Sequence, residues 1–271
     1  MQPDPLDISQ STSSIPPIAP VPPAASQAIA PAWHTIVLIA AILAISASGS
    51  SRLSAAHGPV HLYRTYGATA LMELVLLGWV VFGLRLKKIP LRSLLGENSV
   101  RPRTVFIDIG FALVFWFGSL VVLGTLAVAW AVVQADVEHR SPLTPNPQQQ
   151  QAVHALSQLA PTTAIEIAAW VLLCLTVGVC EEIVFRGYLQ TQFTRWARGA
   201  AAAGVVFSAL VFGGAHAYQG IRNMVLLAVF GALFSGLVLF RRGLRAAIFA
   251  HSWHDLVTGL ALALLKSHGL I

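Results

Sequence analysis

Charged residues are scarce in this sequence. Only 10% of the 271 residues are Asp, Glu, Lys or Arg, whereas 56% are hydrophobic and the mean hydropathy is +0.70. Soluble domains carry about 25% charged residues, so the composition excludes an ordinary water-soluble domain and predicts an all-α integral membrane protein. The net charge of +6 does not indicate nucleic-acid binding, because the basic residues are scattered among short loops between apolar runs.

Cysteine pairs with CxxC spacing and N-terminal basic residues are also missing from the sequence. The two cysteines, Cys174 and Cys180, share one apolar segment without CxxC spacing and indicate neither an oxidising nor a reducing compartment. Residues 1–32 contain no basic residue and are rich in Pro and Ala. That composition cannot build a core and predicts a disordered tail. The tail also lacks the features of a signal peptide, so no cleavage is expected.

Seven apolar segments follow the tail, each about long enough to cross the ~30 Å hydrocarbon core as a helix. The sequence therefore predicts about seven transmembrane helices, divided into an N-terminal membrane region (33–160) and a second membrane region (161–266) that carries the polar motifs. No internal repeat is visible. The predicted segments are 34–50, 66–84, 105–133, 163–190, 201–217, 223–240 and 244–265.

The Lys and Arg residues predict the topology. Twelve of the 17 lie in alternate connections and the other five in the remaining connections. Cytoplasmic loops are the ones enriched in Lys and Arg, which predicts a cytoplasmic N-terminus and an outside C-terminus in a multi-pass protein, with a bacterial plasma membrane as the expected location. The twelve are Arg85, Lys87, Lys88, Arg92, Arg101, Arg103, Arg186, Arg195, Arg198, Arg241, Arg242 and Arg245.

Charged residues are most closely spaced in an apolar surrounding at Glu181-Glu182-Ile183-Val184-Phe185-Arg186. On a helix Glu182 and Arg186 lie one turn apart and can form a structural ion pair, whereas Glu181 points elsewhere. Two carboxylates in low dielectric cannot both ionise cheaply unless a cation stabilises one of them. Arg186 is that cation for Glu182, which leaves Glu181 available as a base. The alternative reading is a solvated charge cluster at a helix end.

Two further polar clusters lie in apolar segments. Phe212-Gly213-Gly214-Ala215-His216 places a histidine in the fifth segment, and His251 and Asp255 lie one turn apart in the seventh. Ionisable residues inside membrane spans are costly and indicate function by default. A lone intramembrane His is more often structural, but three clusters on three helices favour one shared polar site. Glu73, Asp108 and Glu166 each stand alone and are interpreted as structural.

A carboxylate and two imidazoles can activate water with or without a metal. Glu181, His216 and His251 would also suit Zn²⁺ with an open position for water, although no cofactor is certain. The protease motifs HExxH, GxSG and GxGD are absent. The competing class is a non-enzymatic transporter or scaffold, in which the Glu/His cluster passes protons or ions.

In this order, the motifs Glu181-Glu182-x-x-x-Arg186, Phe212-x-x-x-His216 and His251-x-x-x-Asp255 resemble the three motifs of the CPBP family. That family holds the CAAX prenyl proteases of the Ras-converting type and the bacteriocin-processing (Abi) proteins. The resemblance covers about residues 161–266 and is strongest over Glu181–Gln190, EEIVFRGYLQ.

This resemblance implies an all-helical intramembrane endopeptidase, of glutamate or metallo type, that acts on a membrane-associated or lipidated protein from the cytosolic side. It implies that Glu181 is the general base on water with His216 assisting, and that His251 and the residue at 255 form the oxyanion site. Prenyl proteases of this type carry Asn at the position of Asp255. Because an ionised Asp cannot donate a hydrogen bond, it would have to be protonated, orient His251 or bind a metal.

Overall fold

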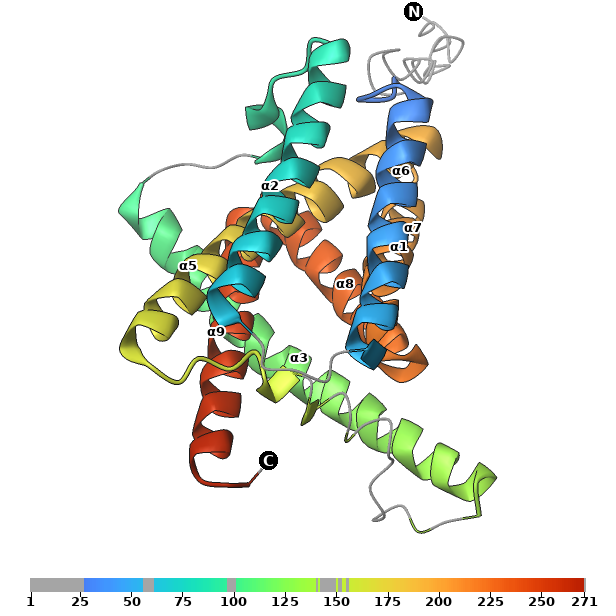
Figure 1. Ribbon diagram of the computed structural model, residues 1–271. Helices are drawn as coiled ribbons and strands as arrows, with labels where there is room; N and C mark the ends of the chain where they lie inside the picture. Colours follow the sequence, from blue (N-terminus) through green and yellow to red (C-terminus); the bar gives the residue numbers. More distant parts are fainter. Residues whose placement is uncertain are drawn as a thin grey trace, which may run out of the picture.

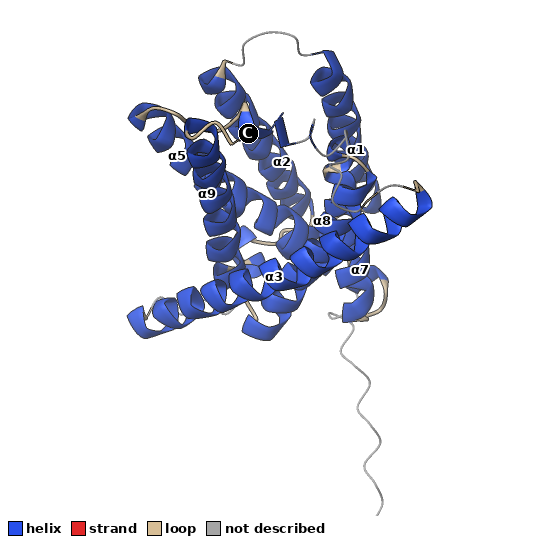
Figure 2. Ribbon diagram, turned by 90° about the horizontal axis from the view of Figure 1, so that it is seen from below, coloured by secondary structure: helices blue, strands red, loops and turns tan. Residues whose placement is uncertain are grey.

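The computed structural model describes residues 27–55, 61–96, 101–139, 141, 150, 153–154 and 156–270. Within these ranges the chain forms helices and no strand (Figures 1 and 2), which confirms the predicted all-α class. Most of the predicted tail, residues 1–26, lies outside the described residues. The helices are α1 (Ala32–Ala55), α2 (Leu62–Leu86), α3 (Pro102–Val137), α5 (Ala164–Glu181), α6 (Gln190–Trp196), α7 (Ala201–Ala215), α8 (Ile221–Arg241) and α9 (Arg245–Ser267), with the short helical segments η2 (Leu91–Leu94), η3 (Glu182–Leu189) and η4 (Ala217–Gln219).

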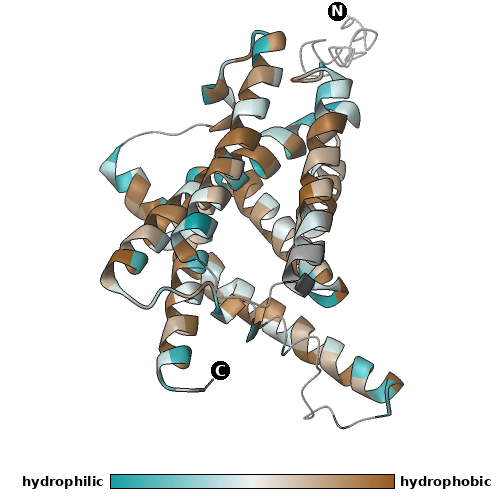
Figure 3. Cartoon of the chain, viewed as in Figure 1, coloured by the Kyte–Doolittle hydropathy of each residue, from teal (hydrophilic) through white to brown (hydrophobic). Residues whose placement is uncertain are grey.

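Six helical stretches of the described chain are long and apolar enough to cross a membrane, and apolar residues cover much of their surface (Figure 3). One of them, Ala164–Trp196, is α5, η3 and α6 combined. The predicted fifth span, 201–217, is instead the 15-residue helix α7. At 1.5 Å per residue it is about 22 Å long, less than the ~30 Å hydrocarbon core. The seven predicted segments therefore correspond to six helical stretches that are long enough to span the membrane and one shorter helix.

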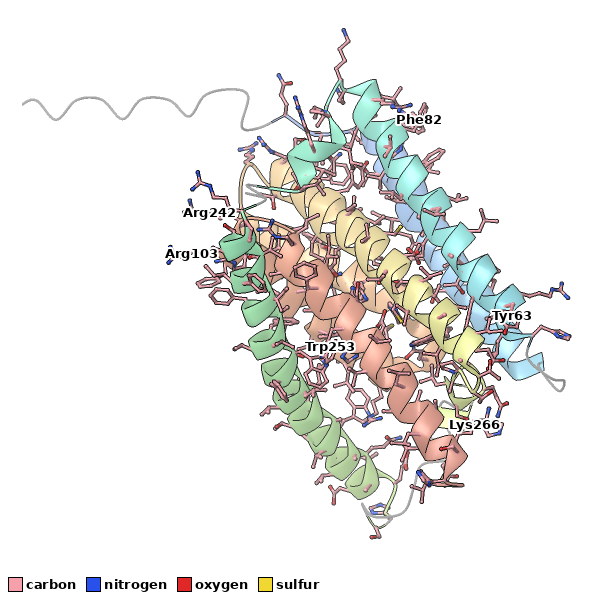
Figure 4. The ribbon with its side chains drawn as sticks, turned by 90° about the vertical axis from the view of Figure 1, so that its left-hand side faces the viewer. Tyr63, Phe82, Arg103, Arg242, Trp253 and Lys266 are labelled. Atoms are coloured by element: carbon pink, nitrogen blue, oxygen red, sulfur yellow. The ribbon has the colours of Figure 1, made fainter. Side chains whose placement is uncertain are left out.

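The basic connections gather at one end of the helix bundle. Arg103 and Arg242 lie at this end, and Tyr63 and Lys266 lie at the other (Figure 4). The α2–α3 and α8–α9 connections touch there, because the Leu244 N–H donates to the Leu95 carbonyl at 3.1 Å. Connections that alternate along the sequence thus lie at opposite ends of the bundle. The end that carries Arg103 and Arg242 is called the basic end.

Which side of the membrane the basic end faces is a prediction that cysteine labelling can test. Cys174 and Cys180 are buried, so single cysteines introduced elsewhere would react over a low background. Arg92→Cys, exposed in η2, is expected to resist a membrane-impermeant maleimide in intact cells. Ser267→Cys, exposed at the opposite end, is expected to react. The reverse pattern would invert the predicted orientation.

A buried polar cluster attaches the start of α1 to the helix that carries the motif. Gln192 accepts hydrogen bonds from the Ile29 and Ala30 N–H groups and donates to the Ala30 carbonyl at 2.8 Å. His34 contacts Tyr188 Oη through Nδ1 at 2.9 Å and the Trp79 carbonyl through Nε2 at 2.8 Å. A carbonyl only accepts, so His34 Nε2 carries the proton and Tyr188 donates to Nδ1. These bonds join α1 to α2, η3 and α6 near the basic end.

The long helix α3 packs against α8 and α9 and is tied to them by an ion cluster. Asp108 Oδ1 lies 2.7 Å from Arg241 Nη2, and its other oxygen pairs with Arg245. Asp108 does not stand alone, as the sequence analysis had it, because its partners are the last residue of α8 and the first residue of α9, more than 130 positions away.

Candidate functional site

Glu181 and Glu182 lie at the junction of α5 with η3, a π-helical segment that continues into α6 without a break. The predicted fourth segment, 163–190, therefore extends to Trp196, and Arg186 lies inside it rather than in a basic loop. Glu182 is 0% and Arg186 2% exposed, so a solvated cluster at a helix end does not describe this pair. π-helical turns are rare and frequently mark functional sites.

Arg186 is held from several sides. Its Nη1 lies 2.9 Å from Glu182 Oε1, and Nη2 donates to the Gly231 carbonyl at 3.3 Å. The guanidinium carbon lies 4.3 Å from the ring centroid of Phe212 and 4.9 Å from that of Phe234. A cation between two aromatic faces and a carboxylate is stabilised by all three. The pair thus joins η3 to α7 and α8.

His251 brings the two carboxylate motifs together. Its Nδ1 lies 2.8 Å from Glu182 Oε1, and because a carboxylate accepts, Nδ1 carries a proton. The other ring nitrogen, Nε2, lies 3.7 Å from Glu181 Oε2 and 3.7 Å from Asp255 Oδ2. A carboxylate that fixes one nitrogen of an imidazole sets the orientation of the ring and the chemistry of the other nitrogen. Three predicted site residues, Glu181, His251 and Asp255, therefore meet at Nε2.

His216 ends α7 and lies beside this group. Its Nδ1 lies 2.9 Å from the Phe212 carbonyl, an acceptor, so Nδ1 carries the proton and Nε2 has a free lone pair. Its ring centroid lies 4.9 Å from that of Phe212, which in turn lies 6.3 Å from that of His251. Among the described contacts, His216 makes no hydrogen bond to Glu181, His251 or Asp255. The ring of Phe212 connects the two imidazoles.

Two glycines let the site helices approach. A Cβ on Gly178 would lie 2.3 Å from Ser252 Oγ, and one on Gly213 would lie 2.6 Å from the Met224 carbonyl oxygen. Both separations are shorter than any real Cβ contact. Gly178 therefore permits the α5–α9 contact next to His251, and Gly213 permits the α7–α8 contact one turn before His216.

Glu73, which the sequence analysis interpreted as structural, is a further buried carboxyl close to this cluster. It is 5% exposed in the middle of α2, and it interacts electrostatically with Glu181, His251 and Asp255. A single acid in an apolar run forms no motif, which is why it was interpreted as structural. The available signal was its position eleven residues into a 25-residue helix, since a carboxyl at such depth is functional by default.

The side chains do not assemble as a metal site would require. Zn²⁺ needs three or more ligands at about 2.0–2.3 Å from one point. Among the described residues, no three His, Cys, Asp or Glu side chains form a group that could hold a metal ion. The predicted trio of Glu181, His216 and His251 therefore does not fit Zn²⁺ in this arrangement.

The fold and the site define an intramembrane cluster of carboxyls and imidazoles on helices α2, α5, α7 and α9. Residues 163–257 match the model of a protein family described as type II CAAX prenyl endopeptidase Rce1-like. The match covers about a third of the chain, spans all three motifs, and confirms the resemblance to CPBP-family proteases. That family's substrates are membrane-associated proteins, and the six apolar helices agree with a multi-pass membrane protein. Comparisons with the curated proteins and with the solved structures gave no match.

Proposed function

We propose that this protein is an intramembrane endopeptidase that hydrolyses a peptide bond of a membrane-associated, lipidated protein. The observation that carries the proposal is the meeting of Glu181 and Asp255 at Nε2 of His251, each at 3.7 Å, inside a buried helix cluster. The match of residues 163–257 to an Rce1-like family supports the reaction class. The enrichment of Lys and Arg at the basic end supports a cytosolic position for that end.

In the proposed reaction, Glu181 removes a proton from water, and the resulting hydroxide attacks the carbonyl carbon of the substrate. His216 assists by accepting a hydrogen bond from that water at its free Nε2. The carbonyl oxygen becomes an oxyanion next to His251 and Asp255. The carbon–nitrogen bond then breaks as the proton on Glu181 passes to the leaving amine.

Glu182 and Arg186 are proposed to hold the His251 imidazole in place. Glu182 Oε1 contacts both Arg186 and His251, at 2.9 and 2.8 Å. One carboxylate thus ties the imidazole to a cation that is itself fixed between aromatic rings. This arrangement limits the rotation of His251, and a preorganised donor stabilises charge in a transition state more than a mobile one.

Proteolysis by the reconstituted protein tests the proposal. The full chain in vesicles would be given a panel of lipidated and unlipidated membrane peptides, and cleavage sites would be mapped by mass spectrometry. Cleavage that depends on Glu181 is the expected result. A pH-sensitive dye inside the same vesicles tests the competing relay function. Proton flux that depends on Glu181, with every peptide intact, would replace the peptidase proposal with the relay.

The substitution Asp255→Asn separates the roles of residue 255. If Asp255 donates a hydrogen bond to the oxyanion, the Asn variant is expected to match or exceed the activity of the original protein, because an amide is a permanent donor. If the carboxylate instead orients His251 from 3.7 Å, activity is expected to fall. Asp255→Leu, which can do neither, provides the fully disabled reference in the same cleavage assay.

A further inference from the structure

Glu73 lies on the face of α2 that points into the protein. The buried residues Tyr66, Glu73 and Val80 recur every seven positions along α2, and this spacing places them on one side of the helix. Tyr66 packs against Trp170 of α5, with ring centroids 5.4 Å apart. The spacing therefore directs the Glu73 carboxyl toward α5 and away from lipid.

Contacts on either side of Glu73 fix its level along α5. Seven residues before it, Tyr66 meets Trp170. Six residues after it, the Trp79 carbonyl accepts a hydrogen bond from His34, and His34 is hydrogen-bonded to Tyr188 in η3, the continuation of α5. Because α2 and α5 run in the same direction between these two contacts, Glu73 lies level with the stretch around Cys180 and Glu181. Its electrostatic interactions with Glu181, His251 and Asp255 agree with this placement.

No cation in the described part of the chain pairs with Glu73. Arg186 pairs with Glu182, and His251 contacts Glu182, Glu181 and Asp255. The described ion pairs give Glu73 no Lys, Arg or His partner. An ionised carboxylate buried without a partner is costly, and the group becomes neutral instead. Glu181 Oε2 is buried and has no hydrogen-bond partner either, and a buried acceptor without a donor is equally unfavourable.

We propose that Glu73 is a positioning residue for the peptidase reaction: its carboxyl keeps a proton and donates a hydrogen bond to Glu181, directly or through one water. This inference rests on the proposed function, because it assigns Glu181 its orientation as the base. Two carboxyls can share a hydrogen bond only when one of them carries a proton, and Glu73, without a cation, is the one that keeps it. The donor then holds the Glu181 carboxylate toward the catalytic water from the opposite helix.

Kinetics of two Glu73 variants test the assignment. Glu73→Gln keeps a neutral side chain with a donor, so its kcat is expected to stay within a few-fold of that of the original protein. Glu73→Leu removes the donor and is expected to lower kcat by about 10–100-fold, as for other groups that orient a catalytic residue, with KM unchanged. Its melting temperature is expected to stay the same or rise, because a buried polar group has been removed.

Asp108→Asn is the matched control. It neutralises another buried acid, one that ties α3 to Arg241 and Arg245 outside the site. This variant is expected to melt at a lower temperature with an unchanged kcat, which is the pattern of a structural carboxyl. A Glu73→Leu variant with the control's pattern, or with full activity, would overturn the inference. So would a Glu73→Gln variant as inactive as Glu73→Leu.

An infrared measurement decides the protonation of Glu73 without any substrate. The spectrum of the purified original protein minus that of Glu73→Gln at neutral pH is expected to show the C=O stretch of a protonated carboxylic acid. Loss of ionised-carboxylate bands instead would overturn the inference. If the original protein cleaves no peptide but the acid band is present, the proposed function fails while the assignment of a neutral Glu73 stands.

Discussion

Replacing Glu181 with Gln is expected to lower kcat by about 10²–10⁴-fold, the usual effect of losing a general base. The amide keeps the shape and hydrogen bonding of the carboxyl but cannot take a proton from water. The fold is expected to persist, because within the described part of the chain Glu181 makes no ion pair shorter than its 3.7 Å approach to His251, and Arg186 is bound to the other carboxylate. Cleavage rates and melting temperatures of the purified protein measure both effects.

Glu166→Gln is the control for this experiment. The residue lies on the same helix, where its carboxylate and Thr163 form a capping box at the start of α5. The same chemical change there is expected to leave kcat intact and to change the melting temperature little, because Gln also serves at this position of a capping box. A purified Glu181→Gln protein that cleaves at the original rate would remove Glu181 from the mechanism. Adding His216→Ala to Glu181→Gln is expected to lower kcat little further, because the effects of groups that act as one unit are not additive.

The sequence was sufficient to predict which side chains of the candidate site share a helix face, because they lie in short helical motifs. Glu182 and Arg186, and likewise His251 and Asp255, are four residues apart, so helical geometry alone places each pair on one face. The contact between the motifs, from His251 Nδ1 to Glu182 Oε1, depends on how α9 packs against α5. That packing could not be deduced from spacing.

Three features of the fold could not be predicted from local patterns. The π-helical turn at Glu182–Leu189 leaves no mark in hydrophobic periodicity, since both faces of this stretch are buried. The ion cluster of Asp108 joins residues more than 130 positions apart. The role proposed for Glu73 depends on the packing of α2 beside α5, a contact between the N-terminal region and the motif-bearing region. Long-range packing decided the last two cases, whereas composition and helix length sufficed for the all-α membrane class and for six of the seven predicted spans.

Replacing Arg186 with Met is expected to lower the free energy of unfolding by about 3–5 kcal/mol, the usual cost of removing one partner of a buried ion pair. Met keeps much of the aliphatic volume between Phe212 and Phe234 but leaves the Glu182 carboxylate without its cation. The melting temperature in detergent and the yield of folded protein measure the loss. Activity should fall as well, because Glu182 also holds His251.

The double variant Glu182→Gln/Arg186→Met separates the charge from the packing. Neutralising Glu182 removes the unpaired charge that Arg186→Met creates, so the double variant is expected to be more stable than the single one. Such non-additivity is the signature of a direct pair. Activity should not return, since an amide holds the His251 imidazole less firmly than a carboxylate does. An Arg186→Met protein as stable as the original would show that Glu182 is neutral in the folded protein, and His251 would then lose the anion that orients it.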